Sequence, residues 1–260
     1  MPLIDGPDGP LHHVVTGVGD PTTVFVPGLA QSVADTRPFG SAVAGTRVFV
    51  DLRGHGGSPA PASDDGWTYS ALAGDVRAVA DAVGATRALG VSLGAGALLR
   101  LLAGDPHRFE RVVLALPGPP VGARDAALLE VTDALADAVE ANDPITMGRA
   151  LVRLQPAAAR GRTDVRLWAR RHAADLGGTA VSGALRRMPR QQVLPSLDAL
   201  GAVTASVLVL GQRDDEVHPL EAAEALTAAI PGARLEVSDV PWIWGGRTAL
   251  RDTVSAFLNG

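Results

Sequence analysis

The sequence predicts an α/β fold in which helices flank a mostly parallel β-sheet. Short apolar runs of the kind found in doubly buried strands alternate with segments whose apolar residues recur at helical spacing. One such run leads directly into a G-x-S-x-G sequence and then a helical pattern. Alternation of this kind indicates parallel β-α-β units. The chain of 260 residues is long enough for one such domain with a modest insertion.

The first half of the chain supplies four predicted strands and one helix. An Asp-Gly turn between the apolar runs at residues 3–5 and 11–15 favours a hairpin. Two further apolar runs, at residues 23–27 and 46–51, read as buried strands. Residues 69–83 have a helical apolar pattern, and Gly84 stands at the position of a C-terminal helix cap.

The most informative stretch runs from Thr86 to Leu102. An apolar strand ends at the sequence Gly90-Val-Ser-Leu-Gly94, and a helical pattern begins at once. Glycines on both sides of Ser92 permit a turn too tight for larger side chains. Such a turn lifts the serine hydroxyl out of the sheet, and the amide of Leu93 at the start of the helix can face a developing oxyanion.

Residues 109–116 read as the next strand, and a helical segment is predicted after it. Residues 121–203 contain no convincing strand pattern and read as several helices: 128–139, 145–154 and 164–176. In the last of these, Val165, Trp168, His172 and Leu176 share one face because they are three or four residues apart.

The last part of the chain returns to alternating strands and helices. Residues 205–211 read as a strand, 219–230 as a helix, and 233–237 as the final strand, before a terminal helix that carries Leu250 and Val254 on one face. The loop after the first of these strands contains the pattern D-x-x-x-P, in which Asp215 is the aspartate and Pro219 the proline.

These motifs, together with the string D-x-R-G-H-G-x-S at residues 51–58, resemble the α/β-hydrolase superfamily in order and spacing. The resemblance implies that residues 1–120 and 204–260 form the hydrolase core and that residues 121–203 form a helical cap. It gives the 51–58 string a mainly architectural role, so His55 is expected to be structural.

The resemblance also implies roles for individual residues. Ser92 would be the nucleophile, and the amides of Leu29 and Leu93 would be the oxyanion donors. Asp215 would be the catalytic acid, with Asp214 as the fallback. In the loop before the first oxyanion donor, Pro27 replaces the histidine that is common in the family, while Gly28 is retained.

The catalytic histidine is missing from its usual place. The family carries this base on the loop after the last strand, where its Gly-His pair falls on Pro241-Trp242 here, and no histidine follows His218. An indole nitrogen only donates hydrogen bonds, so Trp242 cannot accept the serine proton. The remaining candidates for the base are His172, from the cap, and His218, three residues beyond the acid.

Three functions remain open at this point. The first is hydrolysis of a small apolar ester or lactone through Ser92 with an unusual triad. The second is a non-hydrolytic enzyme, a lyase or cyclase acting on a carbonyl-bearing metabolite, and the third is a catalytically silent binding protein. In each, the substrate-binding residues are expected to be Gly28, Trp168, Trp242 and Trp244.

Composition limits the possible partners. The net charge of −5, with basic and acidic residues interleaved, argues against nucleic acid, so a small molecule is the expected partner. The chain has no cysteine, which excludes thiolate metal ligands, and we expect neither metal nor cofactor. It has no apolar run long enough for a bilayer and no signal-peptide pattern, so a cytoplasmic protein without membrane contact is expected.

Overall fold

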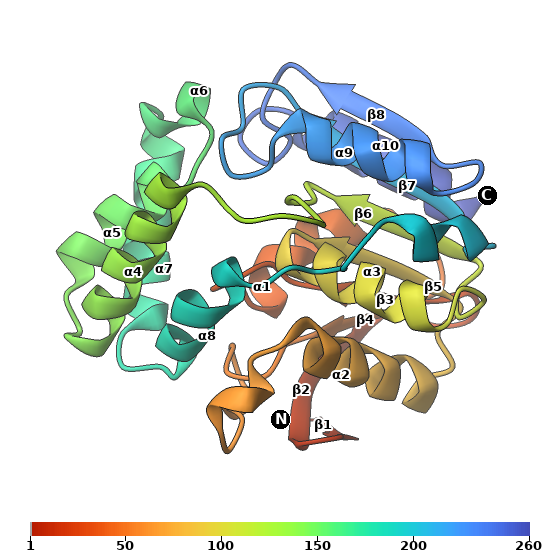
Figure 1. The fold of residues 1–260 in the computed structure, drawn as a ribbon, viewed down its shortest axis with the longest axis horizontal. Helices are drawn as coiled ribbons and strands as arrows, with labels where there is room; N and C mark the ends of the chain where they lie inside the picture. Colours follow the sequence, from red (N-terminus) through yellow and green to blue (C-terminus); the bar gives the residue numbers. More distant parts are fainter. Residues whose placement is uncertain (1) are drawn as a thin grey trace.

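A computed structural model describes residues 2–260 of the chain. Eight strands form one sheet in the order β1-β2-β4-β3-β5-β6-β7-β8 (Figure 1). The pairs β1–β2 and β2–β4 are antiparallel, and every other pair is parallel. The predicted fold class, a mostly parallel sheet flanked by helices, is therefore confirmed.

The observed elements agree closely with the sequence patterns. The strands are β1 (Leu3–Gly6), β2 (Gly9–Thr16), β3 (Thr22–Val26), β4 (Thr46–Val50), β5 (Arg87–Val91), β6 (Arg111–Ala115), β7 (Ser206–Gln212) and β8 (Arg234–Ser238). The helices are α1 (Val33–Thr36), α2 (Tyr69–Ala82), α3 (Leu93–Gly104), α4 (Ala126–Glu140), α5 (Pro144–Arg153), α6 (Ala157–Arg160), α7 (Thr163–Leu176), α8 (Val181–Arg187), α9 (Leu220–Ala229) and α10 (Arg247–Asn259).

The central strands are buried on both faces, as their continuous apolar runs predict. In β3, Val24 and Val26 pack in the core shared with α2, α3 and α9, while Phe25 points to the other face, into the core shared with α10. Successive side chains of a strand point to opposite faces, so each strand contributes to both cores. The sheet is thereby held rigidly between two helical layers, which fixes the loops at its edge.

Helices α4–α8 lie to one side of the sheet, beyond the carboxyl ends of the parallel strands (Figure 1). Residues 116–205, all of which the structure describes, contain these helices, two short 3-10 turns and no strand. The loops that follow β3, β5 and β7 open at the same edge of the sheet, which is where ligands bind in open α/β sheets. The functional site is therefore expected between this edge and helices α4–α8.

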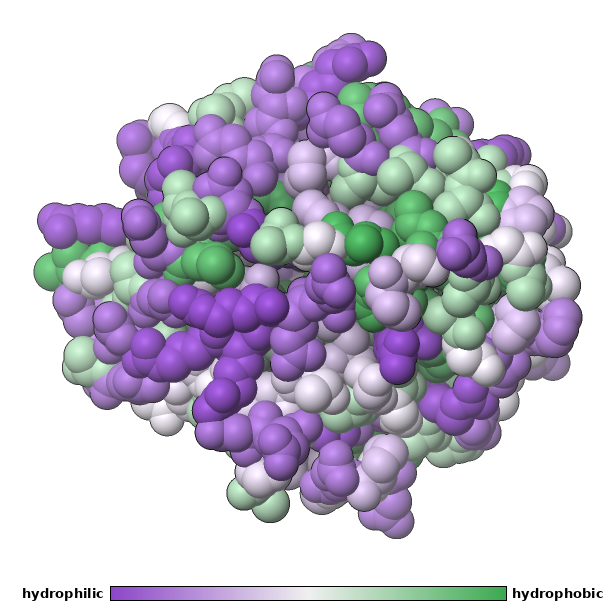
Figure 2. Space-filling view, viewed as in Figure 1, coloured by the Kyte–Doolittle hydropathy of each residue, from purple (hydrophilic) through white to green (hydrophobic). Residues whose placement is uncertain are grey.

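The visible surface is dominated by hydrophilic side chains. Figure 2 shows apolar residues on this face in separate groups between polar ones. In the part of the chain that the structure covers, no helix combines the length and the apolar character required to cross a membrane.

Candidate active site

Ser92 sits at a strained turn between β5 and α3. Its φ of 49° and ψ of −105° are unusual for a residue other than glycine. A Cβ at Gly90 would lie 2.5 Å from the backbone of Gly94, and a Cβ at Gly94 would lie 2.5 Å from the carbonyl oxygen of Val26. Both positions therefore require glycine, as predicted, because backbone atoms cannot yield as a flexible side chain would.

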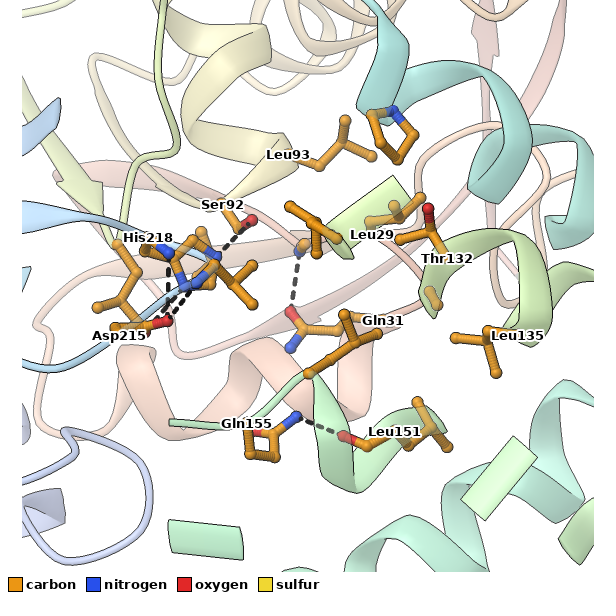
Figure 3. Close-up of a pocket in the computed structure, with 18 of the residues that line it drawn as sticks. Leu29, Gln31, Ser92, Leu93, Thr132, Leu135, Leu151, Gln155, Asp215 and His218 are labelled. Carbon is orange, nitrogen blue, oxygen red and sulfur yellow. Dashed lines mark hydrogen bonds and ion pairs between the residues drawn. The ribbon is translucent and has the colours of Figure 1, made fainter. Parts of the chain in front are cut away.

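His218 lies between Ser92 and Asp215 (Figure 3). Its Nε2 is 2.9 Å from Ser92 Oγ, and its Nδ1 is 3.0 Å from Asp215 Oδ2. Ser92 follows β5, whereas Asp215 and His218 lie on the loop between β7 and α9. Of the two candidate histidines, His218 is the one that the fold brings to the serine. The arrangement can move a proton from Oγ to Nε2 while Asp215 holds the other ring nitrogen.

The Asp215 carboxylate is buried but fully hydrogen bonded. Oδ1 accepts from the backbone N–H groups of Val217 and His218 at 3.0 and 3.1 Å, and Oδ2 accepts from Gln212 Nε2 at 3.1 Å as well as from His218. Burial alone would raise the pKa of Asp215, but the charge of His218 and these hydrogen bonds together lower it below the ordinary value. Asp215 is therefore ionised at neutral pH. Asp214 has a positive φ of 55° and does not line the cavity.

The lowered pKa of Asp215 predicts a pH-dependent contribution to stability. Replacing Asp215 by Asn should reduce the free energy of unfolding by about 1 to 3 kcal/mol at pH 7, because charged hydrogen bonds are lost. The stabilisation is complete above the unfolded pKa of about 3.9 and disappears as pH falls through the lower folded value. Urea unfolding of both proteins between pH 7 and pH 3 measures this difference, which should shrink below about pH 4. A difference that persists unchanged at pH 3 would contradict the assignment.

Two backbone amides beside Ser92 are available to a ligand. The N–H groups of Leu29 and Leu93 have no acceptor within residues 2–260. The neighbouring amide of Gly28 instead donates to Gln31 Oε1 at 2.9 Å, which ties down the loop after β3 (Figure 3). Leu29 and Leu93 line the cavity together with Ser92. Free amides next to a nucleophile are suited to hold an oxyanion.

His172 is held away from Ser92 by contacts of its own. Its Nε2–H donates to the carbonyl oxygen of Ala30 at 2.6 Å, and its ring stacks on Trp168 with centroids 4.9 Å apart. Ala30 has a positive φ of 58°, so this hydrogen bond supports a strained residue next to Leu29. His172 thus lines the cavity, but the structure gives it no contact with the serine.

Trp242 does not line the cavity, contrary to the sequence prediction. Its backbone N–H donates to Gln212 Oε1 and its indole N–H donates to the carbonyl oxygen of Gly211, both at 2.8 Å. These two bonds orient the indole ring toward the apolar core on the α10 side of the sheet. The residue is 5% exposed there. Trp242 is therefore a packing residue of this core.

The other predicted binding residues do line the cavity. Gly28, Trp168 and Trp244 all face it, and the two indoles meet edge to face with centroids 5.3 Å apart. Trp244 Nε1 also donates to Gln155 Oε1 at 2.8 Å, which joins the loop after β8 to helices α5 and α6. This aromatic wall closes the cavity on the side of α7.

The cavity lies between the sheet edge and helices α4–α8 and has a volume of about 150 Å³. Leucines from α4, α5 and α8 line it opposite the residues of the sheet edge: Leu128, Leu135, Leu151 and Leu185. A cavity of this volume accepts a guest about the size of benzene. Its largely apolar wall and few polar groups are typical of a small-molecule site.

The string at residues 51–58 is a buried structural network. Asp51 accepts from His12 Nδ1 and from the backbone N–H of Val33, both at 2.7 Å. His55 bonds through Nδ1 to the carbonyl oxygen of Arg53 at 2.9 Å, and burial lowers its pKa. Its side chain does not line the cavity, in agreement with the structural role expected from the sequence.

Two functional candidates have no clear signal in the sequence. Gln212 connects Asp215 with the backbone of Trp242, and Arg124 extends from the loop after β6 into the cavity. Gln212 directly follows the predicted strand at residues 205–211 and is the last residue of β7, and Arg124 lies in a Pro- and Gly-rich loop. The only available signal was the presence of polar side chains where parallel strands end.

The chain matches a family model described as "alpha/beta hydrolase fold" over residues 21–240. This range includes Ser92, Asp215 and His218 and ends before Trp242. Among curated proteins, the chain is 30% identical over 241 residues to "Putative carbamate hydrolase RutD" of Variovorax paradoxus (strain S110), with 87% of this chain and 86% of the relative covered.

Solved structures share the fold at lower identity. The enol-lactonase from Burkholderia xenovorans LB400 is 22% identical and superposes with a TM-score of 0.82, with all of both chains covered. The esterase EaEST from Exiguobacterium antarcticum is also 22% identical, with a TM-score of 0.81 and 99% of each chain covered. At this level of identity, these two matches show the similarity of the fold.

Proposed function

The protein belongs to the α/β-hydrolase family, and we propose that it hydrolyses a small, largely apolar ester or lactone through Ser92. His218 is the general base and Asp215 the acid that orients it. The observation that carries the proposal is the 2.9 Å contact between His218 Nε2 and Ser92 Oγ. It supplies the base that the loop after β8 lacks, so the non-hydrolytic and silent alternatives lose their main support.

The reaction follows from the positions of these groups. Ser92 Oγ attacks the substrate carbonyl carbon while its proton passes to His218 Nε2, and Asp215 stabilises the imidazolium. The carbonyl oxygen becomes an oxyanion bound by the amides of Leu29 and Leu93. Collapse of this intermediate breaks the ester C–O bond, and His218 gives its proton to the leaving oxygen. A water molecule then hydrolyses the acyl-enzyme by the same steps.

The cavity limits the substrate. Its volume of about 150 Å³ suits a compound of about six to ten non-hydrogen atoms, and its leucine and tryptophan walls favour apolar groups. We propose that helices α4–α8, within the predicted cap at residues 121–203, set this limit, because they supply the wall opposite the sheet. The names of the two solved relatives, an esterase and an enol-lactonase, support esters and lactones.

Carbamates are the second candidate. The Variovorax paradoxus relative is named for carbamate hydrolysis and is more similar in sequence than the two solved structures above. A carbamate presents the same type of carbonyl carbon to Ser92. A panel of matched esters, lactones and carbamates with the same small apolar group would rank the three by kcat/KM.

Labelling with a small fluorophosphonate tests whether Ser92 is activated. We expect one adduct per chain by intact-mass spectrometry, no adduct with Ser92→Ala, and a labelling rate at least about 100-fold lower with His218→Ala, since general-base catalysis contributes about 10²- to 10⁴-fold. His107, on the exposed surface and bonded to Thr204, provides the matched control, and His107→Ala should label like the native chain. Undiminished labelling of His218→Ala would exclude His218 as the base.

A further inference from the structure

The cavity contains an arginine without a carboxylate partner. Arg124 lines it from the loop between β6 and α4, and its Nη1 donates to the carbonyl oxygen of Val217 at 3.3 Å. No ion pair to Arg124 exists among residues 2–260, whereas Arg53, Arg153 and Arg186 each pair with a carboxylate. A guanidinium has five N–H donors, so Arg124 retains donors beyond its bond to Val217 that can bind a ligand.

The cavity cannot neutralise this charge itself. Asp215 is the one acidic residue that lines it, and both of its oxygens are already occupied by Gln212, His218 and two backbone N–H groups. Arg124 is only partly exposed, so its charge has fewer water partners than a charge at the open surface. An anionic group on the substrate would pair with it.

The position of the guanidinium is built into the fold. Any Cβ at Gly118 would overlap the guanidinium group, so the arginine is seated against the bare backbone of a glycine. Tyr69, 5% exposed, faces the same cavity and is close enough for the charge of Arg124 to act on it. Burial raises the pKa of Tyr69 and the charge of Arg124 opposes the rise, so the phenol remains a hydrogen-bond donor at neutral pH.

We propose that Arg124 and Tyr69 form a carboxylate subsite, so that the preferred substrate is an ester or lactone that also carries a carboxylate. This inference rests on the proposed function and adds the substrate class to it. The guanidinium binds the carboxylate oxygens side by side, and the Tyr69 hydroxyl donates to one of them. The rest of the substrate, between the carboxylate and the reacting carbonyl, contacts the leucine wall.

Matched ester pairs test the subsite. Monomethyl esters of straight-chain dicarboxylic acids with three to five carbons, which stay within the size limit of the cavity, are compared with methyl esters of monocarboxylic acids of the same length. For the native chain we expect kcat/KM to be about 10- to 100-fold higher for the anionic ester at the best length. In Arg124→Met this preference should disappear, mainly through a higher KM for the anionic ester.

Two further variants distinguish carboxylate binding by Arg124 from its support of the loop that contains Val217. Gly118→Ala keeps the arginine but displaces the guanidinium, so it should also lose the preference; Arg166→Met, on the exposed face of α7, should keep it. Equal losses for anionic and neutral esters in Arg124→Met would overturn the proposal, because Arg124 would then merely support Val217 beside His218.

Binding to the Ser92→Ala protein separates this inference from the proposed function. Calorimetry with the monomethyl dicarboxylates should show affinity that Arg124→Met removes, whether or not the native chain turns these compounds over. Turnover of neutral esters without any anionic preference would overturn the subsite and leave the hydrolase proposal in place. Arginine-dependent binding without turnover of any ester would support the carboxylate subsite and overturn the hydrolase proposal.

Discussion

Alanine at Ser92 or at His218 is expected to lower kcat by about 10⁴- to 10⁶-fold, and alanine at both positions should be little worse than either alone. In the proposed triad, nucleophile and base act as one unit through the 2.9 Å contact, so the loss of either one already removes the contribution of the other. Initial rates on the best ester from the panel, with burst kinetics to exclude contaminating native enzyme, measure the effect.

The matched control is His172→Ala. It removes the other histidine that lines the cavity, one that contacts Ala30 rather than Ser92. We expect a loss below about 100-fold, because the hydrogen bond to Ala30 steadies the loop of one oxyanion donor but moves no proton, and a single such donor is worth about 10²- to 10³-fold when removed outright. A His218→Ala protein that retains a tenth of native kcat, or a His172→Ala protein as inactive as Ser92→Ala, would rule out the proposed triad.

Trp242→Ala is expected to lower the free energy of unfolding by about 3 to 5 kcal/mol while the folded fraction keeps most of its kcat. The change empties a buried ring site beside α10 and removes the hydrogen bond to Gly211. Urea unfolding measures the loss, and kcat is determined where the variant is fully folded.

Two other tryptophan variants place limits on this interpretation. Trp242→Phe keeps most of the ring and should cost about 1 to 2 kcal/mol, mainly through the lost indole hydrogen bond. Trp244→Ala removes a ring from the cavity wall and should raise KM more than it lowers stability. If Trp242→Ala abolished turnover in fully folded protein, its ring would act in the active site after all.

The sequence was most informative where local geometry determines the residue type. Gly90 and Gly94 are required by backbone contacts within a few residues of Ser92, so the elbow could be predicted from sequence alone. The placement of Val24 and Phe25 in the cores on opposite faces of the sheet likewise follows from a strand pattern. Family membership and the fold class followed from such local motifs.

The remaining features depend on contacts between distant segments. His218 is 126 positions from Ser92, and its reach depends on how the loop after β7 crosses the sheet edge. Trp242 turns inward because Gln212 and Gly211 hold its two N–H groups, which no pattern around residue 242 indicates. Arg124 gives no periodic signal because it lies in an irregular loop. The division of the chain at residues 121 and 203 stays a prediction.

The placement of Asp215 and His218 on one loop determines how a displacement of that loop would affect the proposed triad. The two residues are three positions apart, and the backbone N–H of His218 donates to the Asp215 carboxylate. Little chain entropy is therefore lost in bringing the two side chains together. A displacement of this loop carries acid and base as a pair and alters one distance, from Nε2 to Oγ. The segment after β8 is then not needed for proton transfer. Apart from Ile243 and Trp244, which line the cavity, residues 239–246 are limited by how they pack against the sheet and α10.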